Sequence, residues 1–187
     1  MKNELKRLDV VCDIALSNVD KKSKPNEKLV KLCNFTDVYY NWAIYSNTAR
    51  TFMTATASKK NIELFSLKQG DVCITKDSET RDDIGMATYI SEPLEDVVLG
   101  YHCALIRPHS ELNGGYLNAY LHSYLGRKYF ENQASGSGQR FSLSKESIGS
   151  IQIPLPSIST QTAIANLLSN IDKKISNNKL INDNLVA

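Results

Sequence analysis

The sequence predicts an α+β fold, in which a globular domain with a mixed sheet is followed by one long C-terminal helix that forms a coiled coil. Short β-branched segments alternate with turn residues in the first 156 residues and predict strands. Apolar residues then recur at alternating spacings of four and three over residues 164–175, which predicts a helix with a narrow apolar seam. We therefore expect a globular unit at residues 1–156 and a helical unit at residues 157–187.

The composition is that of a chain with a hydrophobic core and little charge bias. Hydrophobic residues make up 42% of the 187 residues, and the formal net charge is +2. This small charge does not by itself indicate a nucleic-acid partner, although it is compatible with a local basic patch. No apolar run is long enough to span a bilayer, and the N-terminal sequence MKNELKRLDV has no signal-peptide pattern. We expect a cytoplasmic protein without a membrane partner.

The first half of the chain contains several short predicted elements. Residues 5–17 form a short amphipathic stretch, which a lysine-rich polar loop follows. Residues 29–35 alternate like a strand, and residues 57–67 have helical character. Residues 37–47 form a predicted loop with four aromatic residues, which either stack on bases or pack around an edge of the core. These aromatic residues are Tyr39, Tyr40, Trp42 and Tyr45.

The hairpin at residues 70–90 carries the most informative internal loop. Residues 72–75 and 86–90 are predicted strands, and residues 76–81 form the loop between them. Lysine and serine can hold phosphate, aspartate or glutamate can accept from the cytosine amino group, and Arg81 can reach guanine. The alternative is a solvated hairpin tip with internal ion pairs.

A second polar loop follows a predicted helix. Residues 101–107 predict a strand, and residues 113–132 predict one helix with leucines spaced by fours along one face. That helix should stop at residues 134–138, which read ASGSG and are followed by Gln139 and Arg140. Small residues let backbone N–H groups approach a phosphate, and Arg140 supplies charge beside them. The same composition also suits a plain linker.

No catalytic or metal-site spacing is present. The four cysteines lie in apolar settings without a CxxC pair, so we expect buried free thiols, and the three histidines belong to no metal-binding pattern. Four carboxylates in one loop can hold magnesium as in a nuclease, but metal nucleases gather carboxylates from separate strands. These are Asp77, Glu79, Asp82 and Asp83. We keep nuclease activity only as an alternative.

The C-terminal stretch should begin as a helix abruptly. Pro154 and Pro156 favour extended backbone, and Ser159 or Thr160 is a suitable N-cap. A helix of about 25 residues would span roughly 38 Å, and its narrow seam needs a second helix to cover it. The predicted pairing residues are Ile164, Leu168, Ile171, Ile175 and Leu185.

The segment IQIPLPSISTQTAIANLLSNID resembles the junction in specificity subunits of Type I restriction-modification systems, where a proline-bracketed strand leads through a glutamine into a long helix. The matching residues are Ile153, Pro154, Leu155, Pro156, Gln161, Ile164, Ala165, Leu168 and Asp172. Upstream, LCNFTDVYYNWAI, SLKQGDVCITKDSET, GYHCALIRP and SGSGQRFSLS resemble one class of target recognition domain from these subunits. The resemblance covers almost the whole chain.

The resemblance implies that this chain is a half-subunit. A full specificity subunit has two target recognition domains and two long antiparallel helices, so that each domain reads one half of a bipartite DNA site. Here residues 1–156 would be one recognition domain and residues 157–187 one spacer helix. Two copies would then pair as a homodimer, and the twofold symmetry demands an inverted-repeat target. A spacer of roughly 38 Å is close to one turn of B-DNA at about 34 Å.

The resemblance also implies recognition without chemistry, in defence against foreign DNA. The expected partners are double-stranded DNA, modification subunits that methylate adenine with S-adenosylmethionine, and a restriction subunit that uses ATP and magnesium. No cofactor, metal or catalytic residue is expected in this chain. The predicted DNA-binding residues are Lys59, Lys60, Lys76, Ser78, Glu79, Thr80, Arg81, Ser137, Gln139 and Arg140.

Three alternatives stay open. The chain can be a fragment of a longer subunit with two recognition domains, in which case its helix pairs with a helix of the same polypeptide. It can be a domain that is fused to or docked on another kind of restriction enzyme. It can also be a metal-dependent nuclease that uses the carboxylates between Asp77 and Asp83.

Overall fold

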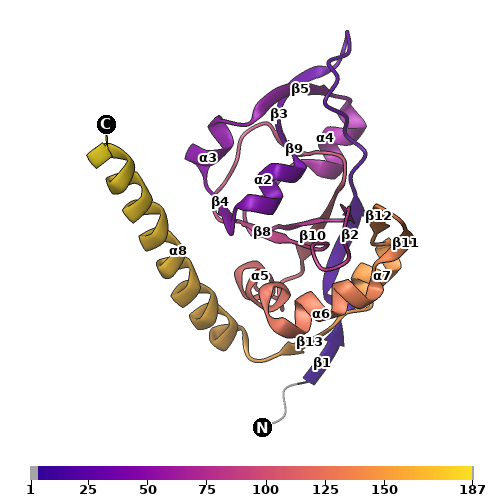
Figure 1. Cartoon of the computed structure of the whole chain (residues 1–187), viewed down its shortest axis with the longest axis vertical. Coiled ribbons are helices and arrows are strands. Elements are labelled where there is room, and N and C mark those ends of the chain that lie inside the picture. Colours follow the sequence, from indigo (N-terminus) through magenta and orange to yellow (C-terminus); the bar gives the residue numbers. More distant parts are fainter. Residues whose placement is uncertain (1–3, 187) are drawn as a thin grey trace.

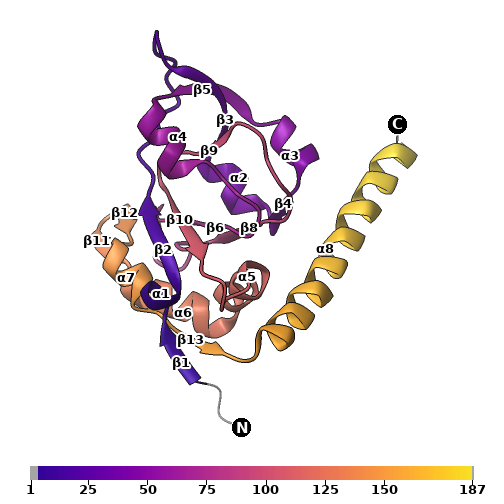
Figure 2. The same ribbon diagram turned by 180° about the vertical axis from the view of Figure 1, so that it is seen from behind.

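The computed structural model describes residues 4–186 and has the predicted α+β architecture with one long C-terminal helix (Figure 1). In helix α8 (Ile158–Val186) it describes side chains to residue 178 and at 181 and 182. No helix among residues 4–186 is long and apolar enough to cross a membrane. Helix α8 leaves the globular domain at one end and runs along its side, as Figure 2 shows from behind.

The central sheet has five strands in the order β2-β10-β6-β8-β4. All pairs are antiparallel except β4 and β8, which are parallel. The strands are β2 (Cys12–Leu16), β10 (Cys103–Pro108), β6 (Val72–Thr75), β8 (Ala87–Ile90) and β4 (Ala43–Ile44). Strands β6, β8 and β10 confirm the strands predicted near residues 72–75, 86–90 and 101–107.

A second sheet of three strands lies at the far end of the domain, in the order β5-β3-β9. Strand β3 is antiparallel to β5 and parallel to β9. The strands are β5 (Met53–Ala57), β3 (Lys28–Cys33) and β9 (Val97–Leu99). Helices α3 (Ser46–Arg50) and α4 (Lys59–Phe65) lie beside them, whereas α2 (Phe35–Tyr40) lies against β6 and β8 of the central sheet. Strand β3 and helix α4 confirm the elements predicted at residues 29–35 and 57–67.

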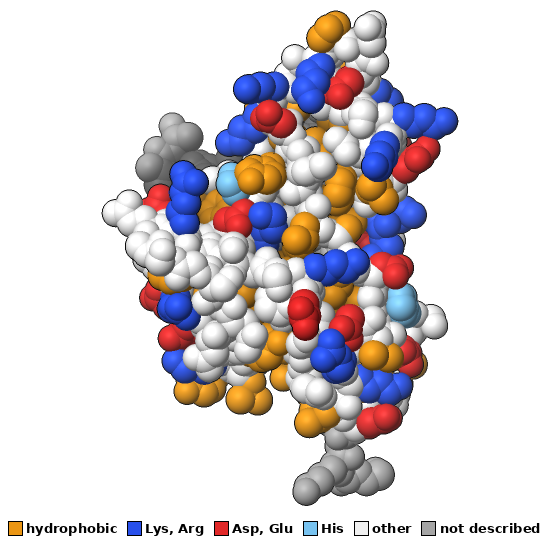
Figure 3. All heavy atoms as spheres, turned by 90° about the vertical axis from the view of Figure 1, so that its right-hand side faces the viewer, with side chains coloured by type: hydrophobic (Ala, Val, Ile, Leu, Met, Phe, Trp, Pro, Cys, Tyr) orange, Lys and Arg blue, Asp and Glu red, His pale blue; other side chains and the backbone are white. Residues whose placement is uncertain are grey.

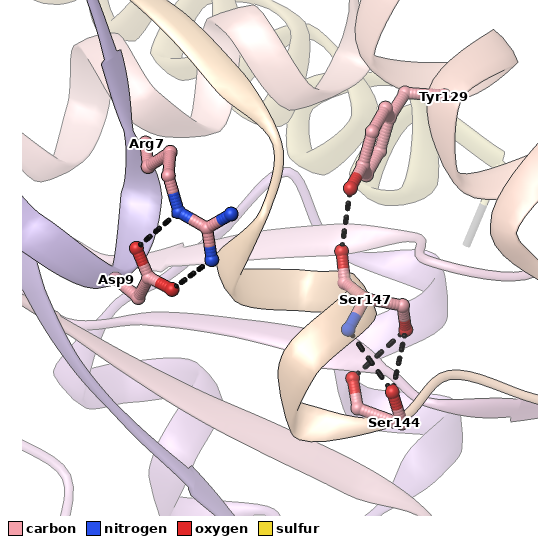
Figure 4. Close-up of polar contacts among 5 residues, drawn as sticks. All are labelled: Arg7, Asp9, Tyr129, Ser144 and Ser147. Carbon is pink, nitrogen blue, oxygen red and sulfur yellow. Dashed lines mark hydrogen bonds and ion pairs between the residues drawn. The ribbon is translucent and has the colours of Figure 1, made fainter.

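The N-terminal segment closes the domain against the segment before α8. Strand β1 (Glu4–Arg7) pairs antiparallel with β13 (Gln152–Leu155), and helix α1 (Leu8–Val11) links β1 to β2. Helix α7 (Lys145–Gly149) packs beside α1, and its N-cap Ser144 accepts a hydrogen bond from the Ser147 N–H at 3.0 Å. The Tyr129 hydroxyl donates to the Ser147 carbonyl at 2.8 Å and ties α6 (Tyr124–Gln133) to α7 (Figure 4).

The apolar side chains form two clusters, one on each face of the central sheet. One cluster lies under α5 (Gly114–His122), α6 and α7, with Phe130 and Leu117 fully buried. The other lies between the two sheets and includes three of the four cysteines. All four are buried free thiols, as predicted: Cys12, Cys33, Cys73 and Cys103. Burial raises the pKa of Cys12 and of Cys103 to about 12, which keeps both thiols protonated.

Three local predictions were wrong. The single helix expected at residues 113–132 is two helices, α5 and α6, because Ser123 takes extended backbone and accepts from the Gly126 N–H as an N-cap. The loop expected at residues 37–47 overlaps α2, because Asn34 and Asp37 form a capping box at its start. Helix α8 starts at Ile158, and Ser157, instead of Ser159 or Thr160, accepts from the Thr160 N–H at 3.3 Å.

The aromatic residues of the 37–47 segment are mostly engaged in packing. The Trp42 ring lies 4.6 Å from the His122 ring, and the Tyr39 hydroxyl donates to Asp83 at 2.6 Å. His122 is half-buried, with its Nε2 atom 2.7 Å from the Ala87 carbonyl oxygen, and this partial burial lowers the pKa of the imidazole. The packing interpretation therefore holds for these rings, while Tyr40 is exposed.

Candidate functional site

Strand pairing brings the two predicted polar loops together. Strand β7 (Asp77–Ser78) follows β6, and it pairs with β12 (Arg140–Ser142), which in turn pairs with β11 (Ser135–Ser137). Residues 134–138 are therefore not a plain linker but part of a hairpin. Gly136 has a φ of +137°, and a Cβ there would lie 2.0 Å from the Arg140 carbonyl oxygen. Only glycine fits this position.

A pocket of about 900 Å³ opens between this small sheet and the turn that precedes β10. Polar side chains from both predicted loops line it, together with aromatic rings from α2, β12 and the turn. Its lining residues are Phe35, Asp77, Ser78, Glu79, Thr80, Asp83, Tyr101, His102, Ser135, Gly136, Gln139, Arg140, Phe141 and Ser142. The pocket offers hydrogen-bond donors and acceptors beside aromatic faces. Base edges are read by such donors and acceptors, and the faces of bases stack on aromatic rings.

One carboxylate oxygen organises one wall of the pocket. The Asp77 Oδ2 atom lies 2.5 Å from the Lys76 Nζ atom and 2.7 Å from the His102 Nδ1 atom. The Lys76 ammonium also lies 5.1 Å from the centre of the Tyr101 ring. These contacts hold Lys76 inside the site, where its side chain is only 13% exposed. Lys76 therefore neutralises Asp77 and does not project toward a phosphate.

Two arginines provide positive charge near the pocket. The Arg81 guanidinium lies 5.0 Å from the centre of the Phe141 ring, a cation–π contact that orients it. Arg140 lines the pocket, and its side chain is exposed at the end of the β11–β12 hairpin. Since arginine presents a planar fork of donors, either residue can form a bidentate contact with guanine.

The predicted site residues are not all in one place. Five of them line the pocket: Ser78, Glu79, Thr80, Gln139 and Arg140. Lys76 and Arg81 contact residues of its wall, and Ser137 lies in the same hairpin without lining it. Lys59 and Lys60 begin α4, away from the pocket lining, so that any DNA contact they make is a separate one.

The carboxylates do not converge as a metal site. Asp77 is engaged by Lys76 and His102, and Asp83 accepts from the Tyr39 hydroxyl. Throughout the described part of the chain, no three His, Cys, Asp or Glu side chains are arranged to hold a metal ion. The nuclease alternative therefore finds no support in this geometry.

Sequence reasoning missed the contribution of the turn before β10. Tyr101 and His102 belong to this turn, and their rings lie 3.9 Å apart. His102 has a φ of +72°, which is uncommon for a residue with a side chain. No local pattern predicts this conformation or the pairing of β7 with β12. In the segment just before β10, the adjoining Gly100 was the residue that indicated a turn.

The surface charge agrees with the small net charge. Figure 3 shows the side of the molecule that faces right in Figure 1, where the β11–β12 hairpin lies. Lysine and arginine side chains alternate there with aspartate and glutamate side chains instead of forming one continuous basic surface. Recognition by this surface would depend on specific contacts more than on total charge.

Helix α8 contacts the domain along one narrow stripe. The Gln161 side chain is fully buried, Ala165 is 7% exposed, and Asp172 accepts from the Tyr45 hydroxyl at 2.8 Å. A second, apolar stripe lies about a quarter turn around the axis of α8 from the stripe that contacts the domain, counting about 100° per residue. This apolar stripe is largely exposed. Its members are Ile164, Leu167, Ile171 and Ile175, at 37%, 63%, 47% and 62% exposure.

The pairing residues predicted from the sequence fit this stripe in part. Ile164, Ile171 and Ile175 belong to it, whereas Leu168 is half-buried between the stripe and the domain side of the helix. Leu167, which the prediction omitted, is exposed on the stripe. The side chain of Leu185, the last predicted pairing residue, lies outside the described residues.

Comparisons with known proteins give one family and one fold. A family model described as Type I restriction modification DNA specificity domain matches residues 2–186. A search of curated proteins finds no match to this chain. Among solved structures, a chain from a study of complex assembly and conformational transition of the type I R-M system is 19% identical, with a TM-score of 0.64. That alignment covers 98% of this chain and 42% of the other.

Two further structures have the same fold. The HsdS subunit from Thermoanaerobacter tengcongensis is 19% identical with a TM-score of 0.57, and the alignment covers 96% of this chain and 40% of that one. The Type-I restriction-modification system S subunit from M. genitalium is 16% identical with a TM-score of 0.59, covering 93% and 40%. The chain thus spans about two fifths of the length of these three structures.

Proposed function

We propose that this chain, which belongs to the Type I restriction modification DNA specificity family, reads one half of a bipartite double-stranded DNA target. The family match confirms the resemblance seen in the sequence. The observation that carries this proposal is the joining of two distant loops at one pocket through the pairing of β7 with β12. Glu79, Gln139 and Arg140 present both acceptors and donors at this pocket, as discrimination between base edges requires.

Within a restriction-modification complex, this chain would supply recognition and its partners the chemistry. Modification subunits would methylate adenine with S-adenosylmethionine, and a restriction subunit would use ATP and magnesium, all in the cytoplasm. The engaged states of Asp77 and Asp83 support a role without catalysis, because neither carboxylate is free to act as a base or metal ligand.

The test is the methylome of a host that expresses this chain with its cognate modification subunit. We expect a new methylated adenine within a gapped DNA motif, read by single-molecule sequencing. Expression of the modification subunit alone is the control, and it should yield no such motif. If both proteins are soluble and no new motif appears, the proposed function is wrong.

Arg140→Ala should weaken specific DNA binding of the assembled methyltransferase by about 1 to 3 kcal/mol, as expected for loss of an arginine contact to a base. Binding should be measured by fluorescence anisotropy on the methylated motif and on a scrambled duplex. Arg50→Ala is the matched control, because Arg50 is also exposed but lies at the end of α3, away from the pocket. Unchanged affinity and motif for Arg140→Ala would remove this residue from the site.

We also infer that α8 pairs with a second long helix, which another copy of this chain supplies. The support is the exposed apolar stripe of Ile164, Leu167, Ile171 and Ile175, which is about a quarter turn from the stripe that contacts the domain. A partner helix can therefore cover it without displacing the domain. The alternative is that the second helix belongs to the same, longer polypeptide, since the matched structures are more than twice as long as this chain.

Light scattering at high micromolar concentration should show a dimer of this chain, and the double substitution Ile171→Glu with Ile175→Glu should convert it to a monomer. Two charges in the apolar stripe would be desolvated without partners on pairing. Asn166→Glu with Asn177→Glu is the matched control, because both asparagines are exposed on the opposite side of the helix. A monomeric wild-type chain would refute self-pairing and favour the longer polypeptide.

A further inference from the structure

We propose that His102 reads the exocyclic amino group of an adenine or a cytosine, with Asp77 holding its ring in the required orientation. This inference rests on the proposed DNA-reading function and assigns one contact within it. His102 lines the pocket beside Tyr101, and its side chain is 50% exposed. It is therefore accessible to a base edge that enters from solvent.

The contact with Asp77 determines which nitrogen faces the DNA. A carboxylate can only accept hydrogen bonds, so His102 Nδ1, which lies 2.7 Å from Asp77 Oδ2, must carry a hydrogen. In the neutral ring, Nε2 is then an acceptor. Among the residues that the structure describes, Nε2 has no hydrogen-bond partner. The ring therefore presents one unused acceptor at the pocket.

Contacts of the His102 ring and of its backbone restrict the residue before DNA arrives. The Tyr101 ring packs at 3.9 Å between centroids, and the His102 carbonyl accepts from the Lys76 N–H at 2.9 Å. The backbone at His102 keeps a φ of +72° within this turn. Side chains at such positions persist where surrounding contacts impose them, often at binding sites. An acceptor that is fixed in this way loses little freedom on binding.

An acceptor nitrogen suits an amino group and not a phosphate, because a phosphate diester has no hydrogen to donate. Three carboxylates line the pocket, those of Asp77, Glu79 and Asp83, against the single cation Arg140. The nearby Lys76 is paired with Asp77 and is only 13% exposed. Arg81 adds a further cation against the Phe141 ring, so that the charges near the pocket balance and a phosphate finds no net attraction. The N6 amino group of adenine and the N4 amino group of cytosine, by contrast, are donors in the major groove that Nε2 can accept from.

The test removes the acceptor and the amino group in turn. Asparagine is the most selective substitution at His102, because it removes the acceptor Nε2 alone. Its amide nitrogen takes the place of Nδ1 beside Asp77, and nothing replaces Nε2. Asparagine also tolerates a positive φ. Duplexes carrying the motif of the assembled methyltransferase would be prepared with purine in place of each adenine and 2-pyrimidinone in place of each cytosine, one position at a time. Affinities would be measured at about pH 8.

The wild-type complex should lose roughly tenfold in affinity at one analogue position beyond the loss that His102→Asn shows there, as expected for one hydrogen bond. The position identifies the source: a purine effect means adenine, and a pyrimidinone effect means cytosine. His109→Asn is the matched control, because His109 is exposed beside Asp13, just past the opposite end of β10, and should behave as wild type. Thermal melting checks that each variant is folded.

Three outcomes would overturn the inference. His102→Asn could lose affinity equally on every duplex, which would indicate a phosphate contact or a structural role. It could leave affinity unchanged on the natural motif. The wild-type complex could tolerate loss of every amino group, a result that needs no variant at all. Each of these outcomes leaves a methylated motif intact, whereas failure of the proposed function would leave no motif to test.

Discussion

Asp71→Asn is expected to lower the free energy of unfolding by about 3 kcal/mol, as found when one member of a buried ion pair is removed. The Asp71 side chain is 2% exposed and accepts from Arg107 Nε at 2.8 Å and from an Arg107 terminal nitrogen at 2.7 Å. It also accepts from the Lys68 N–H at 2.8 Å. An asparagine keeps the shape but leaves the Arg107 guanidinium without its countercharge. This pair fixes the turn before β6, the strand that leads directly into the candidate site.

Urea denaturation of the two proteins measures this difference. Asp96→Asn is the matched control, because the Lys28–Asp96 pair is 58% exposed on both sides and should contribute less than about 1 kcal/mol. Asp96 has a φ of +53°, which asparagine also tolerates, so that the control changes charge alone. Equal effects of the two substitutions would mean that burial does not determine the strength of the Asp71–Arg107 pair.

Local patterns predicted those elements whose formation depends on residues that are close together in the sequence. Val72, Cys73 and Ile74 are β-branched or apolar and entirely buried in β6, and the recurring isoleucines predicted α8. The break between α5 and α6 was missed although its signals are local. Ser123 and Gly126 mark the new N-cap, but the leucine spacing favoured one continuous helix. A Cβ at Gly126 would lie 2.5 Å from the Tyr120 carbonyl oxygen, which explains the glycine there.

The candidate site was predicted in its chemistry but not in its assembly. Polar and charged residues in two loops were visible in the sequence, and Ser78 pairs with Phe141 across the β7–β12 ladder. These two residues are far apart in the chain, and no local propensity encodes such a pairing. The role of His102 depends on the same long-range arrangement, since Asp77 reaches it only through the fold. Which of these residues contact bases stays a prediction.

Gln161→Ala is expected to lower the free energy of unfolding by about 3 kcal/mol through lost hydrogen bonds and a cavity. The Gln161 side chain is fully buried, and its oxygen accepts from the Asn113 N–H at 2.8 Å. Its amide nitrogen donates to the Glu111 carbonyl at 3.1 Å and to the Pro156 carbonyl at 2.9 Å. Truncation leaves three partly buried backbone groups without these partners. One side chain therefore joins the start of α8 to both the α5 N-terminus and the β13 exit.

Two further variants separate the causes of this loss. Gln161→Met keeps the volume without the hydrogen bonds, so that it should retain most of the destabilisation if unpaired backbone groups dominate. Thr162→Ala, at the next and exposed position of α8, is the matched control and should be close to neutral. If Gln161→Met proved as stable as wild type, filling the cavity alone would anchor the helix. In the expected case, the polar anchor fixes where α8 leaves the domain.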